Sequence, residues 1–206
     1  MRVLAGVTIA AALLLSGCSS SSEEASADSP TAVSLTDVPA ITSWTSVNGI
    51  MVPLSKTDGP TNGSWEPFAG FSHTPQGAAL AAIGQSVQLS TASDQSWPKM
   101  LAGVAVSGEG RDEFAVNRAL ISSSGTVDPA VAPSILGYVV TDYSDTAASV
   151  DIVQRFPDDS LATTRSAVLW TETDWKLNLP TSQNAVTATA LTDAPVGMVD
   201  LEGTRK

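Results

Sequence analysis

The chain has a single histidine, His73, and its surroundings decide whether it could do chemistry. Imidazole can transfer protons near neutral pH or bind a metal ion, but both tasks need partner groups. A zinc or copper site needs several converging His, Cys, Asp or Glu side chains, and this chain has one histidine and one cysteine, Cys18. Because no second ligand and no nucleophile lies near His73 in sequence, we predict no metal site and no cofactor.

Signatures of the common enzyme classes are also missing from the sequence. It contains neither G-x-S-x-G nor H-E-x-x-H, the motifs of α/β-hydrolases and zinc metalloproteases. The Gly-Glu-Gly at residues 108–110 has no third glycine for a dinucleotide-binding loop. His73 instead directly precedes Thr74 and Pro75, a capping residue and a residue preset for the first helical position. We therefore expect His73 to pack at a helix entrance, and we predict that the protein is not an enzyme.

The cysteine belongs to an N-terminal pattern that predicts export. One positive charge precedes an apolar run over residues 3–15, which is the layout of a signal peptide and is short for a bilayer-spanning helix. Leu15, Ser16, Gly17 and Cys18 resemble the lipobox of bacterial lipoproteins. The resemblance implies removal of residues 1–17 and a diacylglyceryl group on Cys18. Two acyl chains give stable anchoring, so we expect a protein held at the cell membrane and facing outside the cytoplasm.

Composition and charge bound the remainder of the chain. Residues 18–40 are acidic, rich in serine and poor in large apolar side chains, so we predict a disordered tether. Residues 41–206 fit one domain, and 43% of the chain is hydrophobic, which is enough for a sizeable core. A formal net charge of -11 repels phosphate backbones, so nucleic acid is not expected as a direct ligand.

Four parts of this domain differ in pattern. They are an irregular wrapping segment, a helical part, an antiparallel sheet and a C-terminal tail, at residues 41–73, 74–125, 134–180 and 181–206. The first part alternates turn dipeptides with large apolar anchors, namely Trp44, Ile50, Val52, Trp65, Phe68 and Phe71. The sheet part has a hydrophobic period of two and four strands separated by turns. Apolar spacing in the helical part predicts helices at about 75–92, 98–104 and 111–122.

Helices followed by hairpin-linked strands describe an α+β domain, with N-terminal helices packed on a curved antiparallel sheet. The last predicted hairpin, SAVLWTETDWKLNLP, resembles the final hairpin of NTF2-like cone domains. Enzymes of that family use an acid with a histidine or tyrosine inside the cone. The resemblance therefore implies a candidate pocket made of His73, Tyr138, Asp142 and Tyr143. It also implies that the outer sheet face could pair two copies in a homo-oligomer.

A second resemblance concerns residues 44–82. GIMVPLSKTDGP followed by GFSHTPQGAALAA is similar to uncharacterised proteins of actinobacterial integrative and conjugative elements. Envelope proteins of conjugation machinery similar to VirB8 and TcpC also carry NTF2-like domains. We therefore expect an interaction or assembly protein of an envelope complex, with a conjugation or secretion apparatus as its partner.

Three alternatives remain open beside this interaction role. The cone cavity could bind a small ligand, or exposed tryptophans among the five could stack on sugar rings and bind carbohydrate. The third alternative is an NTF2-like enzyme. A tightly packed cone would exclude both the ligand binder and the enzyme, whereas an open pocket lined by an acid and His73 would support the enzyme.

Overall fold

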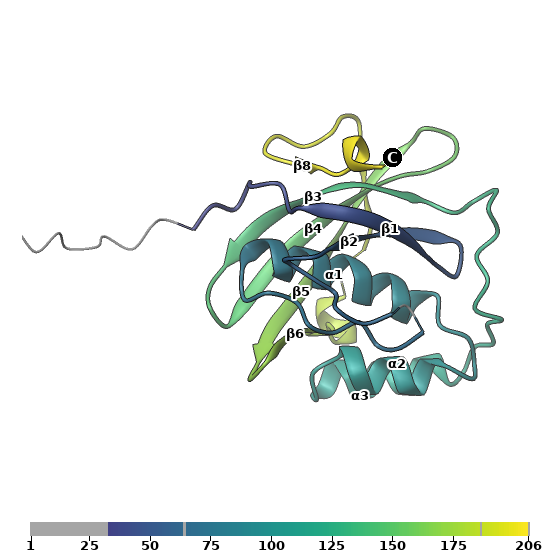
Figure 1. Cartoon of the computed structure of the whole chain (residues 1–206). Helices are drawn as coiled ribbons and strands as arrows, with labels where there is room; N and C mark the ends of the chain where they lie inside the picture. Colours follow the sequence, from purple (N-terminus) through teal and green to yellow (C-terminus); the bar gives the residue numbers. More distant parts are fainter. Residues whose placement is uncertain (1–32, 64, 186, 206) are drawn as a thin grey trace, which may run out of the picture. The chain divides into compact units, whose positions relative to one another are not determined.

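The computed structural model describes residues 33–63, 65–185 and 187–205 (Figure 1). The predicted signal peptide, the lipobox with Cys18 and residues 18–32 of the predicted tether lie outside this range. The described chain has an α+β fold, with three helices and an antiparallel main sheet. Among the described residues, no helix has the length and apolar character needed to span a bilayer.

The main sheet has six strands, ordered β6-β5-β4-β3-β8, and β7 also pairs with β5. Every pairing is antiparallel, and β3 to β6 follow one another as hairpins, as the period of two predicts. The C-terminal tail adds β7 and β8, which the sequence pattern does not reveal. The strands are β3 (Ser134–Tyr143), β4 (Ala147–Arg155), β5 (Leu161–Thr171), β6 (Asp174–Leu177), β7 (Thr189–Leu191) and β8 (Val199–Asp200).

The helices are α1 (Pro75–Ser90), α2 (Trp97–Val104) and α3 (Glu109–Arg118). Helix α1 lies across the sheet and contacts β3, β4, β5 and β6 (Figure 1). Thr74 caps α1 as expected, because its Oγ1 accepts a hydrogen bond of 3.0 Å from the Gly77 backbone N–H. Its alanines are buried, so the helix backbone approaches the sheet closely.

Helix α3 ends at Arg118, four residues before the predicted end at 122. The backbone N–H groups of Leu120 and Ile121 bond three residues back, to Asn117 and Arg118, so the last turn tightens. A run of three serines then follows, and serine favours local side-chain bonds over a continued helix.

The predicted irregular segment at residues 41–73 contains a regular hairpin, so that prediction was wrong for its first half. Strands β1 (Ile41–Val47) and β2 (Ile50–Ser55) pair antiparallel through a two-residue turn. Asn48 and Gly49 take φ angles of 51° and 103°, which the two-residue hairpin turn requires and which Asn-Gly favours. Strand β2 packs on α1 and β3, so this hairpin belongs to the core.

The anchors of the remaining segment, residues 56–73, are Phe68 and Phe71, which are buried. Trp65 was predicted to be an anchor as well, yet it is 87% exposed. Two glutamines of α1 fix the backbone of this segment instead. Gln85 donates to the carbonyl of Phe68, and Gln88 accepts from the Phe68 N–H at 2.7 Å.

Part of the predicted tether lies against the domain. Gln76 of α1 donates hydrogen bonds to the backbone carbonyls of Ser34 and Asp37, at 3.1 and 3.2 Å. Leu35 also packs against the core. Residues 33–40 therefore belong to the packed unit, because Leu35 packs against the core and the carbonyls of Ser34 and Asp37 accept hydrogen bonds from α1.

Candidate functional site

Two of the four predicted pocket residues lie together in an aromatic cluster. The rings of His73 and Trp170 stack, with centroids 4.0 Å apart and 11° between their planes. Trp175 contacts both rings, and Tyr143 lies 5.9 Å from Trp175. Nε2 of His73 is 2.5 Å from the carbonyl oxygen of Asp145, so this nitrogen donates a hydrogen bond. His73 thus packs at the entrance of α1 against the β5–β6 hairpin.

The other two predicted residues do not join this cluster. Tyr138 is fully buried, and burial raises the pKa of its phenol well above the usual range. Its hydroxyl has no hydrogen-bond partner among the described residues. Asp142 is exposed. The register of β3 shifts between Val140 and Asp142, so the alternation of faces slips there and Tyr143, not Asp142, points inward.

A cavity of about 600 Å³ opens instead between α1 and the inner face of the sheet, and we call it the sheet cavity. Its buried lining includes four isoleucines, Ile50, Ile83, Ile135 and Ile152. More exposed apolar lining comes from Phe114 of α3 and from Leu179 and Pro180. Hydroxyl and amide groups make up the polar part of the lining, from Ser86, Ser90, Gln154, Thr164, Ser166 and Asn178.

Strand alternation places two of these polar side chains, those of Thr164 and Ser166, on the inner face of the sheet. Along β5 the residues that share the inner face are Trp170, Val168, Ser166 and Thr164, so the face changes from apolar to polar along the strand. Ser86 of α1 meets this polar part, since its Oγ lies 3.2 Å from the Oγ of Ser166. The inner face of β5 is apolar at Trp170 and Val168 and becomes polar at Ser166. The cavity begins there, beside the hydroxyl pair of Ser86 and Ser166.

Charge is nearly absent from the sheet cavity. Within the described part of the chain, Arg165 is the one ionisable residue in its lining. The guanidinium of Arg165 binds Asp151 with two hydrogen bonds, of 2.7 and 2.9 Å, and this pairing raises its pKa. None of the four predicted pocket residues lines the cavity. The described residues also contain no group of three His, Cys, Asp or Glu side chains placed to hold a metal ion.

A protein-family model described as "Domain of unknown function (DUF8175)" matches residues 10–198. The match includes all three helices and strands β1 to β7. The chain belongs to this family. No curated protein and no solved structure matches it. The description of the DUF8175 family names no activity.

The polar lining of this DUF8175 domain was missed in the sequence, although a signal existed. Thr164 and Ser166 are separated from Val168 and Trp170 by even numbers of residues along a predicted strand, so all four side chains are expected on the same face of the sheet. Polar residues at core-facing positions mark either a strained core or a ligand site. Only the position of α1 over the strand shows that these hydroxyls line a cavity.

Proposed function

We propose that this protein is a lipid-anchored, extracytoplasmic binding component of the cell envelope, and that its sheet cavity holds a small, largely apolar ligand. The observation that carries the proposal is the lining, which combines buried isoleucines with a few hydroxyl and amide groups. Ligand sites in proteins are typically concave and mostly apolar, and a small number of polar groups orients the ligand. A volume of about 600 Å³ lies within the range of such sites.

The lining favours binding over turnover. General acid–base or nucleophilic catalysis needs a titratable group within hydrogen-bond reach of the reacting atoms. The described lining offers serine hydroxyls, but its one ionisable side chain, Arg165, is engaged with Asp151. His73 donates its Nε2 proton to a backbone carbonyl outside the cavity.

An NTF2-like cone is the fold that we propose for this domain. A sixteen-residue helix lies across an antiparallel sheet, and β3 has two register shifts, after Ile135 and after Val140. Such irregularities bend a strand and increase its twist, which curves the sheet around the helix. A cavity between the helix and the curved sheet follows from that curvature.

The envelope setting rests on the lipobox pattern at residues 15–18. A membrane-tethered domain with an apolar cavity could take up a ligand released near the bilayer. The partner that we propose is a conjugation or secretion apparatus, through the resemblance of residues 44–82 to proteins of conjugative elements.

Blocking the cavity from the sheet side tests the proposal. Ser166→Phe places a ring inside the cavity, whereas Ser149→Phe places the same ring on the opposite face of the sheet, because Ser149 alternates with the inward Ala148 and Val150. We expect the full-length chain to bind the apolar fluorophore N-phenyl-1-naphthylamine. Ser166→Phe should weaken this binding at least about tenfold by steric exclusion, and Ser149→Phe should leave it unchanged.

Two results would contradict the proposal. One is equal fluorophore binding by Ser166→Phe and Ser149→Phe, which would place the fluorophore elsewhere. The other is no binding by the unmodified chain. Thermal unfolding of both variants shows whether either ring has damaged the fold.

A further inference from the structure

Trp65 lines a second cleft, which is separate from the sheet cavity. It is the one Trp, Tyr or Phe of the described residues that is exposed, at 87%. Tryptophan is enriched at binding interfaces, because it offers a large apolar ring together with a polar N–H group. The cleft has a volume of about 250 Å³ and shares no lining residue with the sheet cavity.

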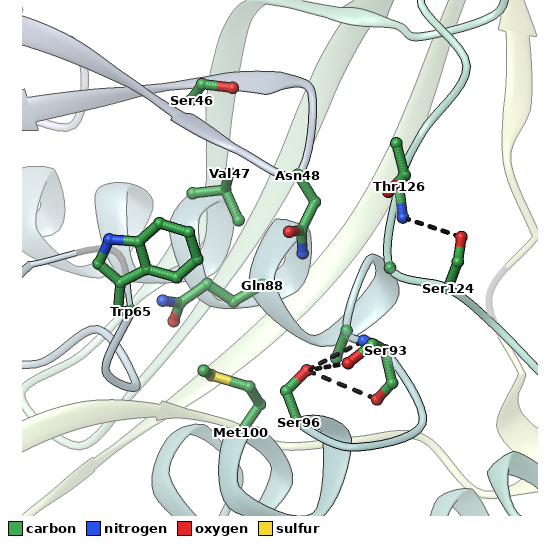
Figure 2. A pocket seen from close by; sticks show the side chains of 12 residues that line it. Ser46, Val47, Asn48, Trp65, Gln88, Ser93, Ser96, Met100, Ser124 and Thr126 are labelled. Atoms are coloured by element: carbon green, nitrogen blue, oxygen red, sulfur yellow. Dashed lines mark hydrogen bonds between the residues drawn. The ribbon is translucent and has the colours of Figure 1, made fainter.

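Uncharged side chains line the cleft beside Trp65, and they are of two kinds: Val47, Ala92 and Met100 are apolar, and the others carry hydroxyl or amide groups. Figure 2 shows Trp65 on one side of the cleft and Ser124 and Thr126 on the other, with Asn48 and Gln88 between them. Ser93 and Ser96 lie nearby, and their hydroxyl oxygens are 3.1 Å apart. Serine and threonine hydroxyls both donate and accept hydrogen bonds, so this wall matches a ligand that is itself rich in hydroxyl groups.

The two walls are held in place by the fold. On the Trp65 side, the Gln88 amide donates to the carbonyl of the adjacent residue, Glu66, at 2.7 Å. On the hydroxyl side, Gly125 has a φ angle of 80° and its Cα passes so close to Ser93 that a Cβ would lie 3.0 Å from the Ser93 backbone nitrogen. Arg118 adds a bond of 3.0 Å to the carbonyl of Ala92. A preorganised cleft loses little free energy in ordering when it binds.

The cleft is also electrically neutral. No charged side chain lines it among the described residues. The acids beside it are paired, Glu66 with Lys99 at 2.7 Å and Asp94 with Arg118 at 2.9 Å. A charged ligand would find no counter-charge here, and an anion would also meet the acidic net charge of the chain.

We propose that this cleft binds a neutral saccharide. A pyranose ring presents an apolar C–H face, which fits the indole of Trp65, and a rim of hydroxyl groups, which fits Asn48, Ser124 and Thr126. The volume equals that of about eight water molecules, which suits a single sugar ring. The site is independent of the apolar ligand proposed for the sheet cavity.

Calorimetric titration with two neutral tetrasaccharides, the β-linked tetramers of glucose and of N-acetylglucosamine, tests this assignment on the full-length chain. We expect at least one to bind. Trp65→Ala should weaken that binding at least about tenfold, and Trp65→Phe should weaken it less, because a smaller ring still stacks. Ser124→Ala combined with Thr126→Val should also weaken it. The matched control is Leu120→Ala, which removes another exposed apolar side chain, 79% exposed and outside the cleft, and should bind as the unmodified chain does.

Several outcomes would overturn the assignment. They are the absence of binding by both tetramers, equal binding by Trp65→Ala and the unmodified chain, and equally tight binding of the anionic tetramer of galacturonic acid. Tighter binding of a proline-rich peptide that depends on Trp65 would also overturn it and would show a peptide site instead. Because Trp65 is exposed, unchanged thermal unfolding of Trp65→Ala is expected in each case.

Discussion

The carboxylate of Asp174 joins two distant parts of the chain. Asp174 is buried at the start of β6 and accepts backbone hydrogen bonds from Gly70, Phe71 and Trp175, at 2.7, 3.1 and 2.9 Å. Backbone N–H groups that lose a buried charged acceptor keep their desolvation cost without compensation. This one side chain therefore holds the segment before α1 against the β5–β6 hairpin.

Asp174→Ala should lower the free energy of unfolding by about 2–4 kcal/mol, because three N–H donors lose their acceptor. Urea unfolding followed by circular dichroism measures the change. Asp193→Ala is the control, since Asp193 is exposed and its loss should change stability by less than about 0.5 kcal/mol. Equal effects of the two substitutions would show that the Asp174 bonds do not stabilise the fold.

Single residues were the hardest features to predict from the sequence. The capping role of Thr74 was predictable because it depends on its immediate neighbours. The contact of His73 with Trp170 joins residues far apart in the chain and needs the fold to be known. The register shift in β3 exchanges the faces of Asp142 and Tyr143, and the residue types of the strand do not predict this shift.

At the scale of elements, the ion pair between Arg118 and Asp94 connects the end of α3 to the loop after α1. Arg118 is buried, and its Nη2 bonds both the Asp94 carboxylate and the carbonyl of Ala92. The N–H of Ser123 and the guanidinium of Arg118 lower the pKa of Asp94 below its usual 3.8. Protonation of Asp94 therefore weakens the connection between these two elements.

This lowered pKa predicts a pH dependence of stability. Because the folded pKa lies below the unfolded one, Asp94 stabilises the fold above about pH 4, and this contribution is lost as the pH falls through the folded pKa. Asp94→Asn should therefore be less stable than the unmodified chain at pH 6, and the difference should shrink toward pH 3. Urea unfolding at both pH values measures it. A difference that stays constant between them would show that ionisation of Asp94 does not contribute.

Elements with a strong periodic pattern were predictable, and those defined by a distant partner were not. The three helices and the hairpins from β3 to β6 follow from apolar spacing and turn residues. Strands β7 and β8 have three and two residues, too few for a period, and they exist because β5 and β3 offer free edges. The β1–β2 hairpin differs from the irregular segment that was predicted, because turn dipeptides alone do not show which of their flanks pair as strands.

Across the whole molecule, two binding sites of different chemistry are proposed for one domain. The sheet cavity is mostly apolar with a few hydroxyl and amide groups, whereas the Trp65 cleft combines several hydroxyl and amide groups with Trp65 and the apolar side chains of Val47 and Met100. A lipid anchor on Cys18 would confine both to the volume near the membrane surface, which raises the effective concentration of ligands found there.

The lipid anchor proposed on Cys18 predicts that the protein is held in the membrane fraction. Cys18→Ala removes the thiol that the lipobox pattern requires for acylation, so the protein should leave the membrane fraction. Fractionation and immunoblotting measure its distribution, and Ser19→Ala serves as the neighbouring control that should stay with the membrane. Membrane association that survives Cys18→Ala would show that the anchor is not a lipid on this cysteine.

If an apolar ligand occupies the sheet cavity, as proposed, the methyl groups of the isoleucines that line the cavity report its binding directly. Among the described residues there are six isoleucines, of which Ile50, Ile83, Ile135 and Ile152 line the cavity, whereas Ile41 in β1 does not. In a chain labelled with ¹³C at the isoleucine δ1 methyls, N-phenyl-1-naphthylamine should shift the NMR signals of those four together and leave Ile41 unchanged. If the four signals stay in place while the fluorophore binds, the sheet cavity is not the binding site.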